Sequence, residues 1–303
     1  MTERRGFAMI TVLWVMMIAT IVATTGALAG RNAVNGARNR TELRRAFWIA
    51  NECASHIRAA IDDSLAAALA PEAAAETWRL LGRQALASTP DECDANLDAA
   101  GTRLDVNTTS DTVLTALFRE LGYGERSTAM VDALEDWKDS DDVARPQGAE
   151  REWYRSERRE LPRNGPIASL RELTLVRGFE DLSTLDTVVS TEPGRVSLAT
   201  ASATVLSAVP GLTRETADRI AEMRDAGTPV RSVLDVLPMV SRSSADLISA
   251  HYPEIARLTT PDPDAWTLSV SASSGYPPNR ATIEWRLVRI EKRAVITRTV
   301  SNF

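Results

Sequence analysis

The sequence predicts an α+β fold in which a long N-terminal helix packs on a small antiparallel sheet and a large all-α insertion interrupts the domain. Three observations predict it. An uncharged apolar run from Phe7 to Gly30 leads into an amphipathic pattern, which indicates one continuous helix. The middle of the chain repeats short strand-like phrases that are each followed by a helical phrase. The tail from Trp266 onward holds three short segments rich in Val, Ile and Thr, which indicates strands.

Composition narrows the classes of function. The 303 residues carry a formal net charge of -6, which disfavours nucleic-acid binding because phosphate backbones reward a surplus of lysine and arginine. Only 2 histidines are present, His56 and His251, and neither belongs to a Ser/His/Asp or Cys/His pattern of nucleophilic catalysis. We therefore expect a non-enzymatic assembly protein. A membrane-anchored DNA-binding protein and an extracytoplasmic enzyme are the competing hypotheses.

The apolar run is long enough to cross a membrane. Its 24 residues, Phe7 to Gly30, contain no charged side chain. As a helix they would cover ~36 Å, against a hydrocarbon core of ~30 Å. Arg4 and Arg5 precede the run, and positive flanking charge favours the cytoplasm. We expect an N-terminus in the cytoplasm, a membrane-spanning segment over residues 7–30 and the bulk of the chain outside the cytoplasm.

The start of the chain resembles the leader of a prepilin-like protein. Arg4 and Arg5 are followed at once by Gly6 and then by Phe7 and the apolar run. In such proteins a leader, here residues 1–6, is cut between Gly6 and Phe7, and the apolar helix is retained. A secretory signal peptide is the alternative, because Ala-Leu-Ala at residues 27–29 could serve as its cleavage site.

Beyond the apolar run the helix is expected to continue and to become amphipathic. Residues 31–45 are rich in Arg and Asn, and Cys53, Ile57, Ile61 and Leu65 then recur every four residues, which is the spacing of one helix face. Cys53 and Cys93 are the 2 cysteines of the chain, and their spacing does not suit a zinc site. Export would allow them to form a disulfide, and two unpaired, partly buried thiols are the alternative.

Thr11 occupies a position of interest. In pilin-like proteins the fifth residue of the mature chain is usually a glutamate, whose carboxylate pairs with the N-terminal ammonium group of a neighbour. Counted from Phe7, the fifth residue here is Thr11. A subunit with no neighbour above it has no ammonium group to pair, so a threonine suits a tip subunit. A tolerated helix residue is the alternative interpretation.

Two segments in the middle of the chain resemble each other. LDVNTTSDTVLTALFRELG starts at Leu104 and VSLATASATVLSAVPGLT starts at Val196, and each predicts a strand-like phrase, a Ser/Thr-rich cap and a helix. Pro210-Gly211 then predicts a turn, and Thr213 caps a helix that starts near Arg214. This outline is that of helix-hairpin-helix or SAM-like units. The hairpin sequence is Pro-Gly-Leu rather than the Gly-x-Gly turn of DNA-binding versions, and acidic residues are as common around it as basic ones. We therefore interpret the units as structural, with DNA binding as the alternative.

An acidic segment lies between the two repeats. Met130–Tyr154 has turn residues at Pro146 and Gly148, and it is crowded with carboxylates, of which we select Asp136, Asp139, Asp141, Asp142 and Glu150 as candidate ligands. Clustered oxygen ligands suit calcium, although the spacing is not that of an EF-hand loop. The alternative is a solvated acidic loop without a metal.

The tail is expected to complete a sheet. The predicted strands are Trp266–Ala272, Ala281–Ile290 and Arg293–Val300, and Thr102–Val106 could add an edge strand. The expected organisation is a leader (1–6), a membrane segment (7–30), an amphipathic helix with the start of an α/β domain (31–106), an inserted α-helical domain (107–258) and the closing strands (259–303).

Together these features resemble the K-type minor pseudopilins of the type II secretion system, the general secretion pathway protein K family. The resemblance is carried by the prepilin-like start with Thr11, by the phrases DWKDSDD at Asp136 and NGPIASLREL at Asn164, and by VSLATASATVLSAVPGL at Val196. It covers residue 5 to about residue 258. One departure is VSLATAS, where a VNVNTA-like phrase would be expected, which puts any role of that turn beyond structure in doubt.

The resemblance implies a function and partners. Such proteins lie at the tip of a periplasmic pseudopilus with I- and J-type minor pseudopilins, and the H-type is a further expected neighbour. It implies cleavage by prepilin peptidase, N-methylation of Phe7 and anchorage in the inner membrane of a Gram-negative bacterium. Exported proteins and the outer-membrane secretin are further candidate contacts. Calcium, for which the acidic segment is the reason, is the one candidate cofactor. No nucleic acid is expected.

Overall fold

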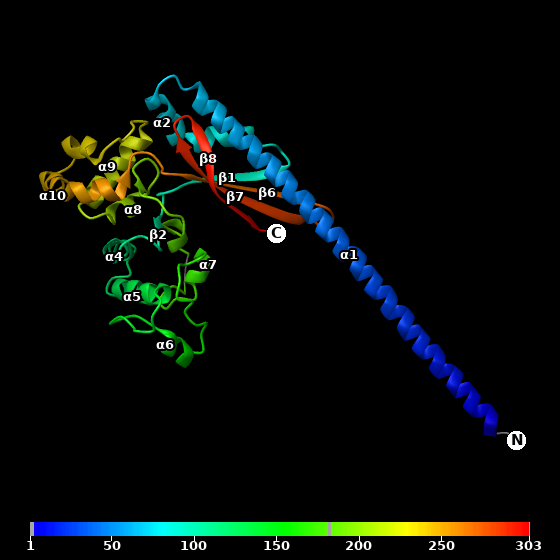
Figure 1. The fold of residues 1–303 in the computed structure, drawn as a ribbon. Helices are drawn as coiled ribbons and strands as arrows, with labels where there is room; N and C mark the ends of the chain where they lie inside the picture. Colours follow the sequence, from blue (N-terminus) through cyan, green and yellow to red (C-terminus); the bar gives the residue numbers. More distant parts are fainter. Residues whose placement is uncertain (1–2, 181–182, 303) are drawn as a thin grey trace.

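A computed structural model describes residues 3–180 and 183–302. The helix α1 runs without a break from Glu3 to Ala67, as the sequence predicts, and projects far beyond the rest of the molecule (Figure 1). Only its C-terminal third packs on the protein. There Cys53, Ile57, Ile61 and Leu65 are buried, which confirms the predicted stripe. Helices α2 (Pro71–Arg79) and α3 (Leu81–Gln84) and the 3-10 turn η1 (Ala85–Ser88) follow.

One antiparallel sheet faces α1. Its strand order is β1-β6-β7-β8, formed by β1 (Cys93–Ala99), β6 (Trp266–Ser274), β7 (Asn279–Ile290) and β8 (Arg293–Asn302). The three tail strands therefore lie where the sequence places them. Alternate residues of β6 and β7, among them Leu268, Val270 and Ile283, are buried against the helix, because successive side chains of a strand point to opposite faces.

The insertion interrupts the chain between two neighbouring strands. Ala99, the last residue of β1, pairs with Trp266, the first residue of β6. The chain between these two residues leaves the sheet after Ala99 and returns to it at the paired residue, Trp266. In Figure 1 this insertion lies on the side of the sheet away from the free part of α1, and its helices form two groups, α4–α7 and α8–α10.

The first half of the insertion is built on a short parallel strand pair. It comprises β2 (Leu104–Asp105), α4 (Asp111–Glu120), α5 (Arg126–Lys138), α6 (Arg151–Ser156), α7 (Leu170–Leu173), η2 (Leu185–Thr187) and β3 (Val189–Ser190). Strands β2 and β3 pair in parallel. Trp137, Tyr154 and Phe179 are fully buried in this half.

The second half repeats the plan. It comprises β4 (Val196–Ser197), α8 (Ala203–Ser207), α9 (Arg214–Asp225), η3 (Val233–Met239), α10 (Arg242–Leu258) and β5 (Thr259–Thr260), with β4 and β5 again paired in parallel. The helix after the Pro-Gly turn starts at Arg214, and the Thr213 side chain accepts a hydrogen bond from the Thr216 amide, as predicted. Both halves share one hydrophobic core.

Two sequence-based boundaries were wrong. Thr102–Val106 was expected to add an edge to the main sheet, but Leu104 and Asp105 pair with β3, because Leu104 and Val106 are buried in the core of the insertion. The strand at this edge of the sheet, beside β6, is Cys93–Ala99, which the sequence did not predict. The insertion therefore begins after Ala99 rather than at residue 107. It extends past residue 258, because Thr259 and Thr260 pair with β4.

Candidate functional site

The N-terminal part of α1 presents its apolar side chains outward. Gly6 and Phe7 lie in the first turns of this helix. From Met9 to Leu28 every large apolar side chain is exposed, among them Trp14, Met16 and Ile18. The 18-residue window with a mean hydropathy of 2.0 has none of its residues buried. Among the described residues, α1 is the one helix long and apolar enough to span a membrane. Thr11 lies on this exposed surface.

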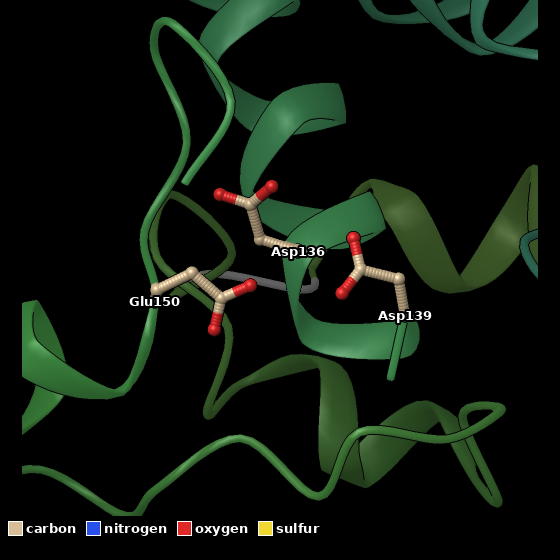
Figure 2. Close-up of side chains that lie close together, drawn as sticks. All are labelled: Asp136, Asp139 and Glu150. Carbon is tan, nitrogen blue, oxygen red and sulfur yellow. The ribbon is translucent and has the colours of Figure 1, made fainter. Parts of the chain in front are cut away.

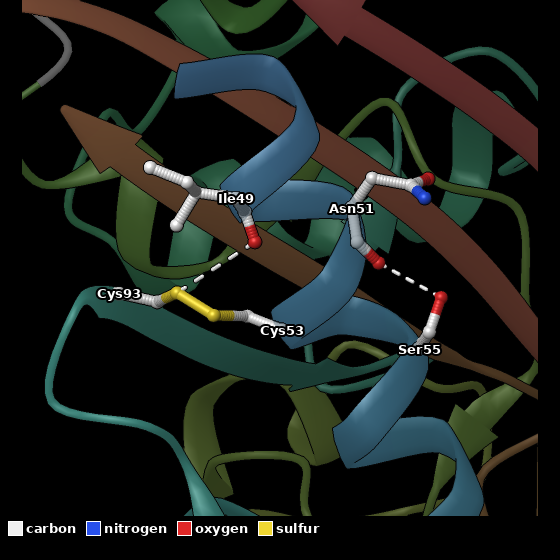
Figure 3. Close-up of a disulfide and its surroundings, with 5 residues drawn as sticks. All are labelled: Ile49, Asn51, Cys53, Ser55 and Cys93. Atoms are coloured by element: carbon white, nitrogen blue, oxygen red, sulfur yellow. Dashed lines mark hydrogen bonds between the residues drawn. A yellow bond between two sulfur atoms is a disulfide. The ribbon is translucent and has the colours of Figure 1, made fainter. Parts of the chain in front are cut away.

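Cys53 and Cys93 are joined in a disulfide (Figure 3). The bond ties the buried face of α1 to the first residue of β1, with 6.7 Å between the two Cα atoms. The pairing was one of the two alternatives that the sequence left open. It fixes the point at which the long helix meets the sheet.

The acidic segment folds into a compact cluster of three carboxylates. Asp136 lies in the last turn of α5, Asp139 follows that helix directly, and Glu150 is the residue before α6. Each offers a carboxylate oxygen, and these oxygens lie within 4.8 Å of one another. In Figure 2 the carboxyl groups of Asp139 and Glu150 point toward one another, and that of Asp136, from the end of α5, lies above them beside the loop that leads into α6.

Two of the three carboxylates are buried and Asp139 is half-buried, which changes the electrostatics of the cluster. Asp136 is fully buried and Glu150 is 4% exposed. Burial raises the pKa of Asp136, although the backbone N–H groups of Arg145 and Ala149 donate to it and oppose the shift. Burial raises the pKa of Glu150 to about 7, and the nearby charges of Asp136 and Asp139 add to that shift. A carboxylate with no opposite charge in such a place is costly in its ionised form.

One oxygen in the cluster has no partner. Glu150 Oε2 accepts a hydrogen bond from the Arg151 amide at 3.3 Å. Glu150 Oε1 is buried and, within the described part of the chain, forms no hydrogen bond. Unsatisfied buried oxygens are rare in folded proteins, and an ion is one of the groups that can satisfy them. The donor set, three carboxylates at this separation, fits calcium, whose oxygen ligands lie at ~2.3–2.6 Å from the ion.

Two of the five predicted ligands lie outside the cluster. Asp141 is exposed, and its carboxylate accepts from the Val143 amide at 2.8 Å. Asp142 is exposed and pairs with Arg151 at 3.4 Å. Because α5 ends before Asp139, both residues follow the loop away from Asp136. The prediction that they join a common site with Asp136 is therefore wrong for this structure.

The backbone that shapes the cluster was not predictable from the sequence. The Arg145 amide donates to both oxygens of Asp136, at 3.1 and 3.2 Å. Gly148 passes so close that a Cβ atom there would lie 1.9 Å from Asp136 Oδ2. Arg177 donates to the Gly148 carbonyl at 2.9 Å and holds the loop in place. Pro146 and Gly148 indicated a turn, but no sequence signal showed that the turn would close over a carboxylate.

The Pro-Gly hairpin between α8 and α9 is packed against the protein. Gly211 has a φ of 86°, and a Cβ atom there would lie 2.5 Å from Cβ of His251 in α10. The basic side chain beside it, Arg214, is already paired with Glu120 at 2.7 Å and with Asp218 at 3.0 Å. A phosphate-binding hairpin needs accessible backbone N–H groups and spare positive charge. This geometry favours the structural interpretation of the hairpin.

Comparison with known proteins gives two family matches. Residues 93–190 match the family model of type II secretion system (T2SS), protein K, and residues 193–241 match that of the helix-hairpin-helix motif. The first match ends at β3 and the second begins just before β4, so together they divide the insertion as the structure does. No curated protein matches the chain.

A solved structure shares the fold over most of the chain. It is a chain of the crystal structure of the GspK-GspI-GspJ complex from the enterotoxigenic Escherichia coli type 2 secretion system. The match has a TM-score of 0.64 and 18% sequence identity, and it covers 88% of this chain and 99% of that chain. Residues 93–190 therefore match the protein K family model on a chain whose fold is seen in that complex, which confirms the resemblance inferred from the sequence.

Proposed function

We propose that this protein is a K-type minor pseudopilin that assembles with I- and J-type minor pseudopilins at the tip of a type II secretion pseudopilus. The observation that carries the proposal is the protein K domain at residues 93–190 on a chain whose fold matches, over 88% of its length, a chain of a GspK-GspI-GspJ complex. The role itself is structural: the protein starts or caps the assembly and supports export of folded proteins, without catalysing a reaction.

The long exposed helix supports membrane anchorage. Its apolar surface has no cover within the described residues and is long enough to cross a bilayer. We propose that Gly6 and Phe7 are separated by prepilin peptidase, that Phe7 is methylated, and that α1 then holds the mature chain in the inner membrane with its bulk in the periplasm. A disulfide between Cys53 and Cys93 suits that oxidising compartment.

The shape of the molecule supports the tip position. The insertion projects from the sheet on the side away from the free part of α1 (Figure 1). A subunit stacked above would have to occupy the same space. Thr11 is consistent with the tip position. A glutamate at this place would pair with the N-terminal ammonium group of the subunit above, and a tip subunit has no such neighbour.

We further propose calcium at the cluster of Asp136, Asp139 and Glu150. The support is the burial of Asp136 and Glu150 and the Glu150 oxygen that has no partner among the described residues. A bound cation would neutralise the carboxylates and tie α5 to α6. DNA binding is not proposed, because the hairpin is packed on α10 and Arg214 is paired with carboxylates.

Co-purification tests the assembly. The full-length protein would be tagged and expressed in its own cells with the I- and J-type minor pseudopilins and then extracted in mild detergent. We expect both partners to co-elute in a stoichiometric complex during gel filtration. Their absence, both with and without added calcium, would contradict the proposal and would reopen the question of what the helix-hairpin-helix units bind.

A further inference from the structure

The second half of the insertion brings the N-terminal ends of two helices together. Thr213 caps α9 by accepting from the Thr216 amide at 3.2 Å, and Ser241 caps α10 by accepting from the Ser244 amide at 3.4 Å. The two caps are joined, because the hydroxyl oxygens of Thr213 and Ser244 lie 2.9 Å apart, at hydrogen-bond distance. The N-terminal end of a helix carries a partial positive charge from its unpaired backbone N–H groups. Two ends of like charge therefore lie side by side.

The start of α10 adds positive charge and has no acid of its own. The first turn of α10 contains no acidic residue. Arg242, the first residue of the helix, is exposed and forms no ion pair with any of the residues that the structure describes. Negative charge is what stabilises this end of a helix, whereas an arginine opposes the helix dipole there. The first turn of α10 therefore needs a negative charge from another element.

Glu215, the second residue of α9, supplies that charge. Its Oε1 accepts a hydrogen bond from the Ser241 amide at 2.8 Å. Its Oε2 accepts from the hydroxyl groups of Ser241 at 2.6 Å and of Ser244 at 2.7 Å. The hydrogen bonds from Ser241 and Ser244 hold the pKa of Glu215 below its ordinary value, so the group is ionised at neutral pH. A backbone N–H and two hydroxyls at a helix start are the donors that proteins use to bind oxyanions.

This contact lies at the surface, where a dissolved ion can reach it. Glu215 and Ser241 are exposed, and Ser244 is buried beneath them. An exposed ionic contact is weak by charge alone. Glu215 has the advantage that α9 tethers it beside its donors, which gives its carboxylate a high effective concentration there. A dissolved anion must displace this tethered group before it can bind.

We infer that the Glu215 carboxylate is an internal anion that holds the starts of α9 and α10 together and closes the helix-hairpin-helix unit to phosphate. A unit of this kind that binds nucleic acid presents N–H groups at a helix start to a phosphate oxygen. In this chain, the carboxylate of the neighbouring helix takes the place of that oxygen at the start of α10. The contact is thus autoinhibitory, and it goes beyond the proposed function without depending on it.

Chemical rescue by inorganic phosphate tests this contact in the full-length protein, in detergent and with a chelator present. Glu215→Ala should lower the melting temperature by roughly 5 °C. Sodium phosphate at about 50 mM should restore at least half of that loss, relative to sodium chloride of equal ionic strength, because phosphate then binds the native state. If Glu215→Ala is unfolded in chloride, folding in phosphate is the same rescue.

Glu222→Ala is the matched control. Glu222 is exposed, belongs to the same helix and pairs with Arg219, so the variant changes the net charge equally and leaves the start of α10 intact. The control and the wild type should gain from phosphate only the small general stabilisation that excluded salts give. The rescue is the gain of Glu215→Ala beyond that of the control.

Phosphorus NMR measures binding directly, through the broadening of the phosphate signal. Glu215→Ala should bind phosphate saturably with a dissociation constant of about 1–10 mM, and the wild type at least tenfold more weakly. Adding Ser241→Ala should weaken the binding to Glu215→Ala several-fold, because one of the donors is lost.

Three outcomes would overturn the inference. A destabilised Glu215→Ala that phosphate does not rescue would show that the contact is structural and that no anion site lies beneath it. Equal phosphate binding by Glu215→Ala and the wild type would show that Glu215 closes nothing. A Glu215→Ala variant as stable as the wild type would show that the carboxylate does not hold the two helices together.

Discussion

Glu150 shows how burial changes the chemistry of a single side chain. Its carboxyl group is held at the start of α6 against Asp136 and Asp139, and its pKa is raised to about 7. In an unfolded chain the same group would release its proton near 4.5, the ordinary value. Between these two pH values the native state therefore binds more protons than the unfolded state, and the stability falls as pH rises through this window.

This difference gives a prediction for the calcium site. In a chelator, we expect the melting temperature of the full-length protein in detergent to fall as pH rises from about 4.5 to about 7, and Glu150→Gln should flatten this slope. Saturating calcium should raise the melting temperature at pH 8 by roughly 5–10 °C, because the ion binds the native state alone. At pH 5.5 the gain should be smaller, because protons compete with the ion.

Asp141→Asn is the matched control for Glu150→Gln. Asp141 belongs to the same acidic segment but is exposed and lies outside the cluster. Its variant should keep the full calcium response, whereas Glu150→Gln should lose it. Equal responses in the two variants would show that the cluster is not where calcium binds, and a chain that does not respond to calcium at all would contradict the metal proposal itself.

At the scale of elements, the Pro-Gly hairpin shows a turn packed closely against a helix. Gly211 and Gly227 both have a positive φ, 86° and 78°, so alanine is strained at either position. They differ in their surroundings: a Cβ atom at Gly211 would meet Cβ of His251 at 2.5 Å, whereas one at Gly227 would meet nothing within 4 Å. The pair therefore separates backbone strain from steric overlap.

We expect Gly227→Ala to lower the free energy of unfolding by about 1 kcal/mol. Gly211→Ala should cost roughly 3 kcal/mol, because overpacking against α10 is added to the same strain. Urea unfolding of the two variants, followed by far-UV circular dichroism, measures the difference. Similar losses in both would mean that α10 does not hold the hairpin, and the N–H groups of the turn would then be available to a ligand.

Elements with a strong apolar period were predictable from the sequence, and those without one were not. The stripe from Cys53 to Leu65 repeats every four residues and is buried as expected. Strand β1 has Asp94, Asn96 and Asp98 on its exposed side and mostly small residues on the other, so it lacks the signal of a strand. It is a strand because it pairs along its whole length with β6, more than 160 residues later in the chain.

The candidate calcium site was also predictable from the sequence only in part. Asp136 and Glu150 were predicted as ligands from composition alone, but their burial depends on how α5, the Gly148 turn and Arg177 meet. Asp141 and Asp142 have the same chemistry, and only the end of α5 separates them from the cluster. Composition therefore identifies candidate ligands, whereas tertiary contacts determine which of them lie close enough together to share an ion.

For the whole molecule, the topology makes the insertion separable from the domain that carries it. Ala99 and Trp266 are paired neighbours in the sheet, and the Ala100 amide donates to the Ala265 carbonyl at 2.9 Å. Among the residues that the structure describes, none of the insertion belongs to the core between α1 and the sheet. At the junction Trp78 donates to the Pro263 carbonyl at 2.8 Å and Arg79 pairs with Asp262 at 2.6 Å. Arg286 and Arg298 of the sheet pair with Glu192 of the insertion.

A deletion that keeps the contacts of Trp78 and Arg79 should fold. Removing residues 101–261 and joining Ala100 through one glycine to Asp262 leaves a four-residue loop, Gly-Asp-Pro-Asp, between the paired residues Ala100 and Ala265. Loops of this length are common in β-hairpins. We expect the shortened protein to keep its disulfide, to resist protease as the parent does and to melt in one cooperative transition, as a single core of this size should.

The same variant tests what the insertion contributes to assembly. Because α1 and the sheet remain intact, we expect the shortened protein to retain partners that contact α1 or the sheet and to lose partners that contact only the insertion. Its co-purification profile in mild detergent, compared with that of the full chain, measures this. A shortened chain that is cooperative and protease-resistant yet recovers no partner would place the whole partner surface on the insertion. One that aggregates or is digested would show that the helix and sheet cannot form a stable core by themselves, contrary to the separate cores seen in the structure.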